Sequence, residues 1–206
     1  MAQYTRNPPL RESGVHKDPR RQLERWLRAA ANAGQIEPTA MTLATVDARG
    51  RPSARLVLFK GYYRGGVTFY TNYESRKGRE LKRNPRAALV FWWDRLERQV
   101  RIEGRVARVP RALSALYFHS RPRVSQLGAL TSRQSREVAS RQLLDERMAA
   151  NEKRLAGRAV PLPEAWGGYV LEPELYEFWQ GRRGRLHDRL AYKKARRGWR
   201  VARLEP

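Results

Sequence analysis

The segment Ser75-Arg76-Lys77 combines a helix-capping hydroxyl with two cations, directly after a strand-like run. A short helix that begins here and ends near Asn84-Pro85 would present unpaired backbone amides and the positive end of its dipole. Together with two fixed cations, these amides suit a phosphate group. The alternative is an ordinary capped surface helix that is basic, and the segment taken alone favours that alternative.

A second group of cations lies near the C-terminus, in Arg185-Leu186-His187-Asp188-Arg189. If residues 186–192 form a strand, alternation puts Arg185, His187 and Arg189 on one face. Two guanidiniums and an imidazole suit an anionic, planar ligand, and Trp179 upstream is a candidate stacking wall. The other interpretation is an edge strand whose charges resist aggregation. The pattern slightly favours the binding site.

Tyr117 and Arg121 are four residues apart at the end of a predicted helix, so they share a face, and Ser125 follows in a loop that contains Pro122. A phenol, a guanidinium and a hydroxyl could together hold a phosphate. As an isolated pattern the signal is weak, because a tyrosine at helical spacing more often packs in a core.

Arg55 and Lys60 flank the apolar run Leu56-Val57-Leu58-Phe59, and the centre of this strand is expected to be buried. Residues five apart fall on opposite faces of a regular strand, so a shared site would need a bulge or a turn of the chain.

Several kinds of catalytic centre are excluded by residue type. The chain has no cysteine, which rules out disulfides, thiolate nucleophiles and Cys-ligated metal centres. His16 and His119 have no metal-ligand spacing with each other or with a carboxylate, so no metal site is predicted. Neither a Gly-rich nucleotide loop nor a Ser/His/Asp pattern is present.

The elements that must position these residues begin with a helix from Asp18-Pro19 to Gly34, with its apolar residues at helical spacing. The apolar period then changes to two, which predicts antiparallel strands at 41–46, 55–60, 67–71, 87–93 and 99–106. Helices are predicted at 111–120 and 137–155, and further strands at 168–171, 175–179, 186–192 and 199–204. The pattern indicates an α+β, mainly β fold: an antiparallel β-barrel with covering helices.

Composition limits the partners and the number of domains. With 43 Lys and Arg against 20 Asp and Glu, the net charge is +23, which attracts phosphates, nucleic acid or acidic membrane surfaces, although dispersed arginines also serve as a solvated surface. No apolar run could span a bilayer, so we expect a cytoplasmic protein without membrane contact. We assign residues 18–206 to a single domain, and residues 1–17 to an N-terminal segment that is a candidate flexible lid.

Taken together, these segments resemble the pyridoxamine 5′-phosphate oxidase family of FMN-binding split barrels. The stretches that carry the resemblance are RLVLFK (55–60), FYTNYESRK (69–77), LERQVRIEG (96–104), YFHSRPRVSQLGA (117–129), SRQS (132–135), PLPEAWGGY (161–169) and EFWQGRRGRLHDR (177–189). They occur in the family's order and spacing, from about residue 18 to the C-terminus.

The resemblance implies a cofactor, FMN, and the residues that bind it: Arg55, Leu56, Val57, Leu58, Phe59, Lys60, Tyr70, Thr71, Arg76, Lys77, Gln99, Gln134, Ser135, Trp179 and Arg189. It further implies that the substrate contacts Lys60, Tyr117, Arg121, Ser125, Arg185, Leu186 and His187. Arg185 and His187 are implied to be catalytic and to lie over the substrate's pyridine ring. In the family several of these residues come from the partner subunit, so a homodimer with FMN at the interface is implied.

The implied reaction is oxidation of pyridoxamine and pyridoxine 5′-phosphates to pyridoxal 5′-phosphate, in vitamin B6 biosynthesis and salvage. A hydride passes to FMN, and O2 is then reduced to hydrogen peroxide. Two alternatives stay open: another split-barrel flavin oxidoreductase, and a basic nucleic-acid-binding protein, although nucleic acid is not the expected partner. The sequence departs from the family at Met1-Ala2-Gln3-Tyr4, where a basic pair often precedes the tyrosine of a lid.

Overall fold

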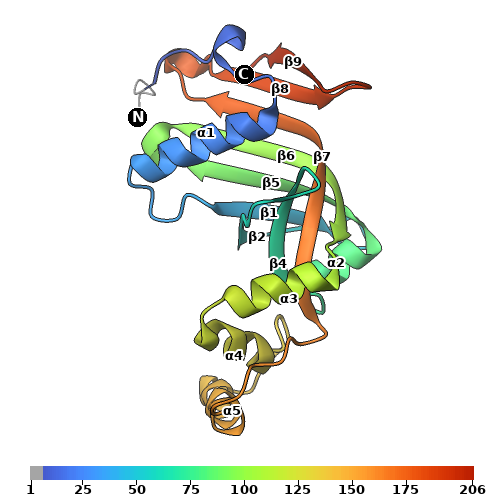
Figure 1. The fold of residues 1–206 in the computed structure, drawn as a ribbon. Coiled ribbons are helices and arrows are strands. Elements are labelled where there is room, and N and C mark those ends of the chain that lie inside the picture. Colours follow the sequence, from blue (N-terminus) through green and yellow to red (C-terminus); the bar gives the residue numbers. More distant parts are fainter. Residues whose placement is uncertain (1–6) are drawn as a thin grey trace.

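The computed structural model describes residues 7–206. One antiparallel sheet carries a long helix on one face, and a group of helices lies at the far end of the molecule (Figure 1). The elements are, in chain order, η1 (Glu12–Gly14), α1 (Pro19–Asn32), β1 (Ala40–Val46), β2 (Pro52–Leu58), β3 (Tyr62–Tyr63), β4 (Gly66–Asn72), α2 (Arg76–Arg83), β5 (Arg86–Trp93), η2 (Asp94–Leu96), β6 (Arg98–Arg108), α3 (Arg111–Ser120), α4 (Arg123–Thr131), α5 (Arg141–Arg154), β7 (Trp166–Gln180), η3 (Arg183–Arg185), β8 (Asp188–Lys194) and β9 (Trp199–Leu204).

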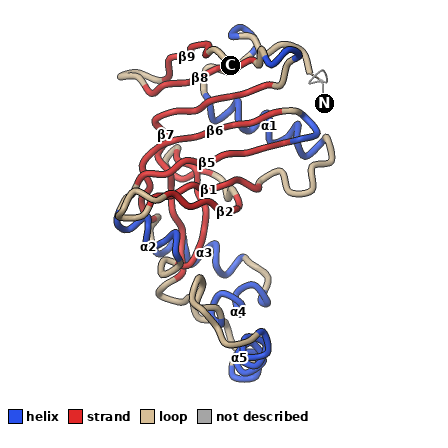
Figure 2. The backbone as a smooth tube through the Cα atoms, turned by 180° about the vertical axis from the view of Figure 1, so that it is seen from behind, coloured by secondary structure: helices blue, strands red, loops and turns tan. Residues whose placement is uncertain are grey.

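The sheet divides at its longest strand, β7. Within the described residues, strand order is β2-β1-β5-β6-β7-β4-β3, and every pairing is antiparallel. Along one edge β7 pairs with β6 over almost its whole length. Along its other edge, the half Trp166–Leu171 pairs with β4 and the half Leu175–Gln180 pairs with β8. The tube view in Figure 2 shows β8 and β9 at one end and α3 to α5 at the other. The predicted α+β class, an antiparallel sheet with covering helices, is confirmed.

Helix α1 forms as the sequence predicts and closes the main core. The Asp18 carboxylate accepts a hydrogen bond from the Arg20 amide at 2.9 Å, and proline occupies the first helical position. Leu23 and Trp26 are buried against the sheet, where the Trp26 ring meets Phe178 edge-on at 5.2 Å. A second, smaller core around Phe118, Leu127 and Trp166 holds the helical end together.

Several predicted element boundaries were wrong. The strands expected at 168–171 and 175–179 are one strand, β7. Pro173 lies opposite Gly104, where the register between β6 and β7 shifts, and such a bulge lets a strand continue through a proline. The stretch after Pro122 is a helix, α4, which was expected to be a loop. Helix α5 begins at Arg141 rather than Glu137, with the Ser140 hydroxyl as its cap.

Strand β2 is not buried at its centre, contrary to the prediction. It lies at the end of the sheet order, with β1 as its partner, and its Leu56 side chain is 71% exposed. Val57 and Phe59 pack against the main core, whereas Leu58 is also partly exposed. An apolar edge strand of this kind suggests that another surface covers it.

Residues 7–17 run beside the C-terminal strands. The Asn7 amide donates to the Leu96 carbonyl at 2.7 Å, Leu10 is buried in the main core, and the Tyr192 hydroxyl donates to the His16 carbonyl at 2.8 Å. The departure from the family at residues 1–4 lies outside the described residues. A lid formed by residues 1–17, and the single domain over 18–206, stay predictions.

Candidate active site

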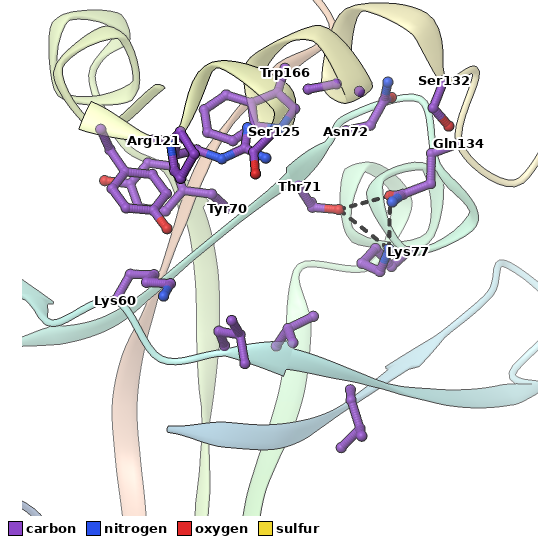
Figure 3. Close-up of a pocket in the computed structure, with 17 residues that line it drawn as sticks. Lys60, Tyr70, Thr71, Asn72, Lys77, Arg121, Ser125, Ser132, Gln134 and Trp166 are labelled. Atoms are coloured by element: carbon purple, nitrogen blue, oxygen red, sulfur yellow. Dashed lines mark hydrogen bonds between the residues drawn. The ribbon is translucent and has the colours of Figure 1, made fainter. Parts of the chain in front are cut away.

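A cavity of about 650 Å³ opens between the barrel strands and the helical end of the molecule (Figure 3). Strands β2 and β4, the start of α2, and helices α3 and α4 contribute to its wall. It is lined by Leu56, Val57, Leu58, Lys60, Tyr70, Thr71, Asn72, Lys77, Tyr117, Arg121, Pro122, Ser125, Gly128, Ala129, Ser132, Gln134 and Trp166. Stretches far apart in the sequence, predicted separately to hold phosphate, therefore share one cavity.

Lys77 is the buried cation of this cavity, with only 9% of its surface exposed. Helix α2 begins as predicted, with the Ser75 hydroxyl accepting from the Gly78 amide at 3.3 Å. A side chain at position 78 would collide with the Tyr73 carbonyl, so glycine lets the helix start close to the preceding turn. The Lys77 ammonium donates to Gln134 Oε1 at 3.0 Å and to Thr71 Oγ1 at 3.3 Å (Figure 3).

Burial, and then the charge of Arg55, lowers the pKa of Lys77 from 10.5 to about 8. Both bonded partners of its ammonium are neutral oxygens. A bound anion would therefore stabilise the charged form of Lys77 more than these partners do.

Arg121 and Tyr117 form the opposite wall of the cavity. Their spacing predicted a shared helix face, but α3 ends at Ser120, and Arg121 follows it with an extended backbone. Tyr117 stacks on Tyr70 with ring centroids 4.0 Å apart, and the Arg121 guanidinium lies 4.9 Å from the Trp166 ring centroid. Burial lowers the pKa of Arg121. Its buried Nη1 has no hydrogen-bond partner among residues 7–206. A buried guanidinium nitrogen without a partner fits an anionic ligand, because leaving such a donor unpaired is costly.

Glu80 anchors two arginines, Arg76 on its own helix and Arg55 on strand β2. The carboxylate is 5% exposed and accepts hydrogen bonds from Arg76 Nε at 2.9 Å and Arg55 Nη2 at 3.2 Å. It also accepts from the hydroxyls of Thr45 at 2.5 Å and Ser53 at 2.7 Å. Burial by itself raises the pKa of Glu80, but these four hydrogen bonds outweigh it and lower the pKa to about 2.

Replacing Glu80 by glutamine is expected to destabilise the fold at neutral pH. At about 1.4 kcal/mol per pKa unit, the fall from 4.5 to about 2 corresponds to about 3 kcal/mol. Because the folded-state pKa is the lower one, this stabilisation is present above pH 4.5 and is lost as the pH falls towards 2. Urea unfolding at pH 7.5 and at pH 3.5 measures the difference. Glu146→Gln, on the exposed face of α5, is the control, and an equal effect in both variants would contradict this account.

The cofactor-binding residues implied by the resemblance divide into those that line the cavity and those that do not. Leu56, Val57, Leu58, Lys60, Tyr70, Thr71, Lys77 and Gln134 line it, as do Tyr117, Arg121 and Ser125 from the substrate set. Arg55 and Arg76 do not line the cavity and instead donate hydrogen bonds to Glu80. The Phe59 ring packs on Tyr62 and Phe91. Ser135 lines an adjoining cavity of about 530 Å³, which shares Gln134 with the first.

The remaining implied residues form a second group, on strands β6, β7 and β8 and the loop before β8. Trp179 lies opposite both Gln99 and Arg189 in the sheet, and its ring is 4.5 Å from that of His187. Arg189 pairs with the buried Glu177 at 2.9 Å. None of this group lines the main cavity of the same chain. The sequence-predicted site is therefore present as two separate halves in one chain.

The prediction that Arg185, His187 and Arg189 share a strand face was wrong. Strand β8 begins only at Asp188, and Arg185 ends the short η3 turn. Gly184 and Arg185 both have left-handed backbone, with φ of 67° and 62°, which no regular strand adopts. His187 instead accepts a hydrogen bond from the Arg182 amide at its Nδ1, 3.1 Å away. Burial, followed by the charge of Arg185, lowers the pKa of His187.

Sequence reasoning gave no role to three polar or aromatic residues of the cavity, Asn72, Ser132 and Trp166. All three lie within stretches that carry the family resemblance, so the resemblance is the signal that could have found them. The Arg121 guanidinium lies over the ring of Trp166. Among residues 7–206, no cluster of three His, Cys, Asp or Glu side chains could hold a metal ion, and no helix is long and apolar enough to cross a membrane.

Comparisons with known proteins agree with the geometry. Residues 27–151 match the family model described as pyridoxamine 5′-phosphate oxidase, and residues 166–206 match the model of the pyridoxine 5′-phosphate oxidase C-terminal dimerisation region. The chain is 54% identical over 204 residues to a pyridoxine/pyridoxamine 5′-phosphate oxidase of Rubrobacter xylanophilus, covering 99% of this chain and 94% of the relative. It is 53% identical to the protein of that name from Cupriavidus taiwanensis, covering 96% of this chain and 93% of the relative.

Solved structures show the same fold. PhzG from Burkholderia lata, solved in complex with tetrahydrophenazine-1-carboxylic acid, superposes with a TM-score of 0.91 at 31% identity, covering 98% of this chain and all of that one. A pyridoxamine 5′-phosphate oxidase-related, FMN-binding protein from Nostoc punctiforme superposes with a TM-score of 0.68 at 17% identity, covering 88% of this chain and 97% of that one.

Proposed function

The chain belongs to the pyridoxamine 5′-phosphate oxidase family, and we propose that it oxidises pyridoxamine and pyridoxine 5′-phosphates to pyridoxal 5′-phosphate with FMN and O2. The observation that carries this proposal is the single cavity lined by Lys60, Lys77 and Arg121, in which the buried Nη1 of Arg121 has no partner among the described residues. These cations suit two phosphorylated ligands, one at each wall.

The residues on the α2 side fit the phosphate of FMN. Lys77 is buried with only neutral oxygen partners, and the amides at the start of α2 add donors and a favourable dipole. Arg76, paired with Glu80, is more than half exposed and adds positive charge at the rim. The chemistry that FMN supplies when bound is acceptance of a hydride from the substrate's exocyclic carbon, followed by reoxidation with O2 to give hydrogen peroxide.

Affinity for FMN is expected to weaken as the pH rises above about 8. The phosphate binds the charged ammonium of Lys77, whose pKa is about 8 in the free protein, so binding at higher pH requires proton uptake. Affinity should then fall by up to about tenfold per pH unit, the limit for one coupled proton. Lys77→Met should weaken binding about 10- to 100-fold at pH 7, the loss expected for a charged hydrogen bond, and should remove this pH dependence.

Fluorescence titration of the flavin-free protein with FMN at pH 7, 8 and 9 measures both effects. Lys82→Met, at the exposed end of the same helix, is the matched control. Unchanged wild-type affinity between pH 7 and 9, or a Lys77→Met variant that binds like the control, would contradict the role given to Lys77.

The opposite wall fits the phosphate of the substrate. Arg121, Lys60 and the hydroxyls of Ser125 and Tyr117 all line the cavity, and Lys60 Nζ lies 6.0 Å from the centroid of the Tyr117 ring. A doubly charged phosphate held here fixes one end of the substrate. The reacting carbon at the other end is then kept at a set distance from the flavin. This positioning is the main contribution of the protein to catalysis in such a reaction.

The second half of the site, with Arg185 and His187, is supplied by a partner subunit in this proposal. The match of residues 166–206 to a dimerisation region indicates a homodimer. Leu56 at the cavity and Leu186 in the η3–β8 loop are 71% and 74% exposed in the single chain, as expected for surfaces covered by a partner. Arg185 then stabilises charge that develops during hydride loss, and His187 and Leu186 complete the contact with the pyridine ring.

PhzG, the structural relative solved in complex with tetrahydrophenazine-1-carboxylic acid, defines the alternative substrate class. That ligand carries a carboxylate and no phosphate, whereas Lys60, Arg121 and Ser125 together suit a phosphate. Strong, steeply salt-dependent binding of DNA by a colourless protein would instead favour a nucleic-acid-binding function.

The experiment that tests the proposal is a visible spectrum of the purified protein, before and after anaerobic addition of pyridoxamine 5′-phosphate. We expect a yellow protein that loses its colour on addition and regains it when air is admitted, with release of pyridoxal 5′-phosphate. A colourless protein that does not take up FMN, or a yellow one that is bleached only by tetrahydrophenazine-1-carboxylic acid, would overturn the proposal.

A further inference from the structure

The N-terminal segment is attached to both ends of the loop that carries Arg185 and His187. This loop joins β7 to β8, and Arg182 and Asp188 stand at its two ends. Arg182 Nη1 donates to the Asn7 carbonyl at 2.8 Å, and the Asp188 carboxylate accepts from the Leu10 amide at 3.0 Å. Since the side chain of Leu10 is buried in the main core, these backbone groups are held in fixed positions.

Asp188 is the centre of this attachment. Its Oδ1 accepts from Arg203 Nη1 at 2.8 Å, and its Oδ2 lies 3.6 Å from Arg182 Nε as well as accepting from Leu10. Arg203 also donates to the Leu10 carbonyl at 2.8 Å and pairs with Glu12 at 2.9 Å. The carboxylate is 16% exposed, so these contacts are partly shielded from water. One side chain thus joins the loop, the last strand and the N-terminal segment.

The loop itself has an irregular backbone that such an attachment would fix. Gly184 and Arg185 have left-handed backbone, with φ of 67° and 62°, a conformation that is unfavourable for a non-glycine residue such as Arg185. The Leu186 side chain is 74% exposed, and the Arg185 side chain makes no hydrogen bond to another described residue. His187 accepts from the amide of Arg182, the same residue whose side chain holds Asn7. Movement at either end of the loop would therefore be passed on to His187 and Arg185.

We propose that Asp188 is a positioning residue for the oxidation: together with Arg203 and the backbone of residues 7–10, it holds the β7–β8 loop in the conformation that presents Arg185 and His187. This inference rests on the proposed function, because it concerns the residues assigned there to the substrate ring. Asp188 itself contacts neither ligand. Its role is to keep the distance and direction of the Arg185 guanidinium constant.

Asp188→Asn is the direct test, because it keeps the shape of the side chain and removes its charge. We expect kcat for pyridoxamine 5′-phosphate to fall about tenfold, within the range that small misplacements of reacting groups produce. Affinity for FMN should stay within about twofold of wild type, because the FMN phosphate site is formed by other residues. Asp145→Asn, another ion-paired carboxylate but on helix α5, should behave as wild type.

Arg203→Met disrupts the same attachment from the last strand and serves if Asp188→Asn does not fold. Arg200→Met, an exposed arginine on the same strand, is its control. A thermal unfolding curve for each variant separates loss of positioning from loss of structure. Wild-type kcat in both Asp188→Asn and Arg203→Met would overturn the proposal.

Combined substitutions distinguish positioning from a general structural effect. If Asp188 acts only through Arg185 and His187, Asp188→Asn should lower kcat by less than about twofold in a protein that already carries both Arg185→Ala and His187→Ala. A further tenfold loss in that background would show that Asp188 acts elsewhere and would overturn the inference. Failure of the proposed function would look different, because then even the wild-type protein would not be bleached by the substrate.

Discussion

Arg185→Ala is expected to lower kcat about 100-fold while the protein keeps its flavin and its stability. A guanidinium that stabilises charge in the transition state contributes on the order of 10²–10³ in rate. Its side chain makes no hydrogen bond within the described part of the chain, and it is exposed there, so its removal should cost the fold little. Alanine also tolerates the left-handed backbone at this position no worse than arginine does.

The measurement is steady-state oxidation of pyridoxamine 5′-phosphate, with the flavin content and the unfolding temperature of the same preparation. Arg183→Ala, in the same η3 turn, is the matched control and should keep nearly full activity. His187→Ala should also retain FMN and lose most turnover. Loss of flavin from Arg185→Ala in proportion to its loss of activity would contradict the assigned role.

Arg121→Met is expected to raise the KM for the substrate about 100-fold without lowering stability. A charged hydrogen bond to a phosphate contributes about 1.5–3 kcal/mol, which corresponds to roughly 10- to 150-fold in affinity. In the free protein the same guanidinium is partly buried over Trp166, and its Nη1 has no partner among residues 7–206. Removing a desolvated, unpaired donor should therefore leave the free energy of unfolding unchanged or slightly increased.

Substrate saturation curves and urea unfolding of the same variant test both parts of this prediction. Arg123→Met is the control, because within residues 7–206 the Arg123 side chain hydrogen-bonds only to the carbonyls of Leu155 and Arg158. This variant should lose stability and keep its KM. An Arg121→Met variant with wild-type KM would show that the substrate phosphate binds elsewhere.

Local patterns predicted those parts of the site that lie within one element. The Ser75 cap predicted Lys77 at a helix start, as the structure confirms. The spacing of Tyr117 and Arg121 predicted that they act together, and both line the cavity, although Arg121 lies just beyond the end of α3. Hydrophobic periodicity and turn residues also predicted the antiparallel sheet and helix α1, and the structure contains both. In each case the controlling interactions lie within a few residues of each other in the sequence.

Local sequence patterns could not predict the features of the fold and the site that depend on contacts between distant elements. The Glu80 carboxylate accepts hydrogen bonds from Thr45 on β1 and Ser53 on β2, and nothing in its own helix indicates these two contacts. Alternation of residue types around Arg185 predicts a strand, but this pattern does not reveal the left-handed backbone that the loop adopts. The exposure of Leu56 follows from the edge position of β2, which a run of apolar residues cannot indicate.

The separation of the predicted residues into two halves is the feature on which the functional account depends most. Lys77 and Arg121 line a cavity near α2 and α3, whereas Trp179 and His187 lie together beside β8. Under the proposed function, a complete site therefore requires that the cavity of one chain meet the β7–β8 loop of another. In a symmetric dimer this juxtaposition occurs twice.

Complementation between two variants that are each nearly inactive at low substrate concentration tests this requirement most directly. Arg121→Met removes the cavity's phosphate contact, and Arg185→Ala removes the loop's contribution, so a mixed dimer contains one intact site and one doubly altered site. With equal co-expression, half of the dimers are mixed, and we expect about one quarter of wild-type activity at a substrate concentration near the wild-type KM. Activity no greater than the average of the two separate variants would contradict a site shared between subunits.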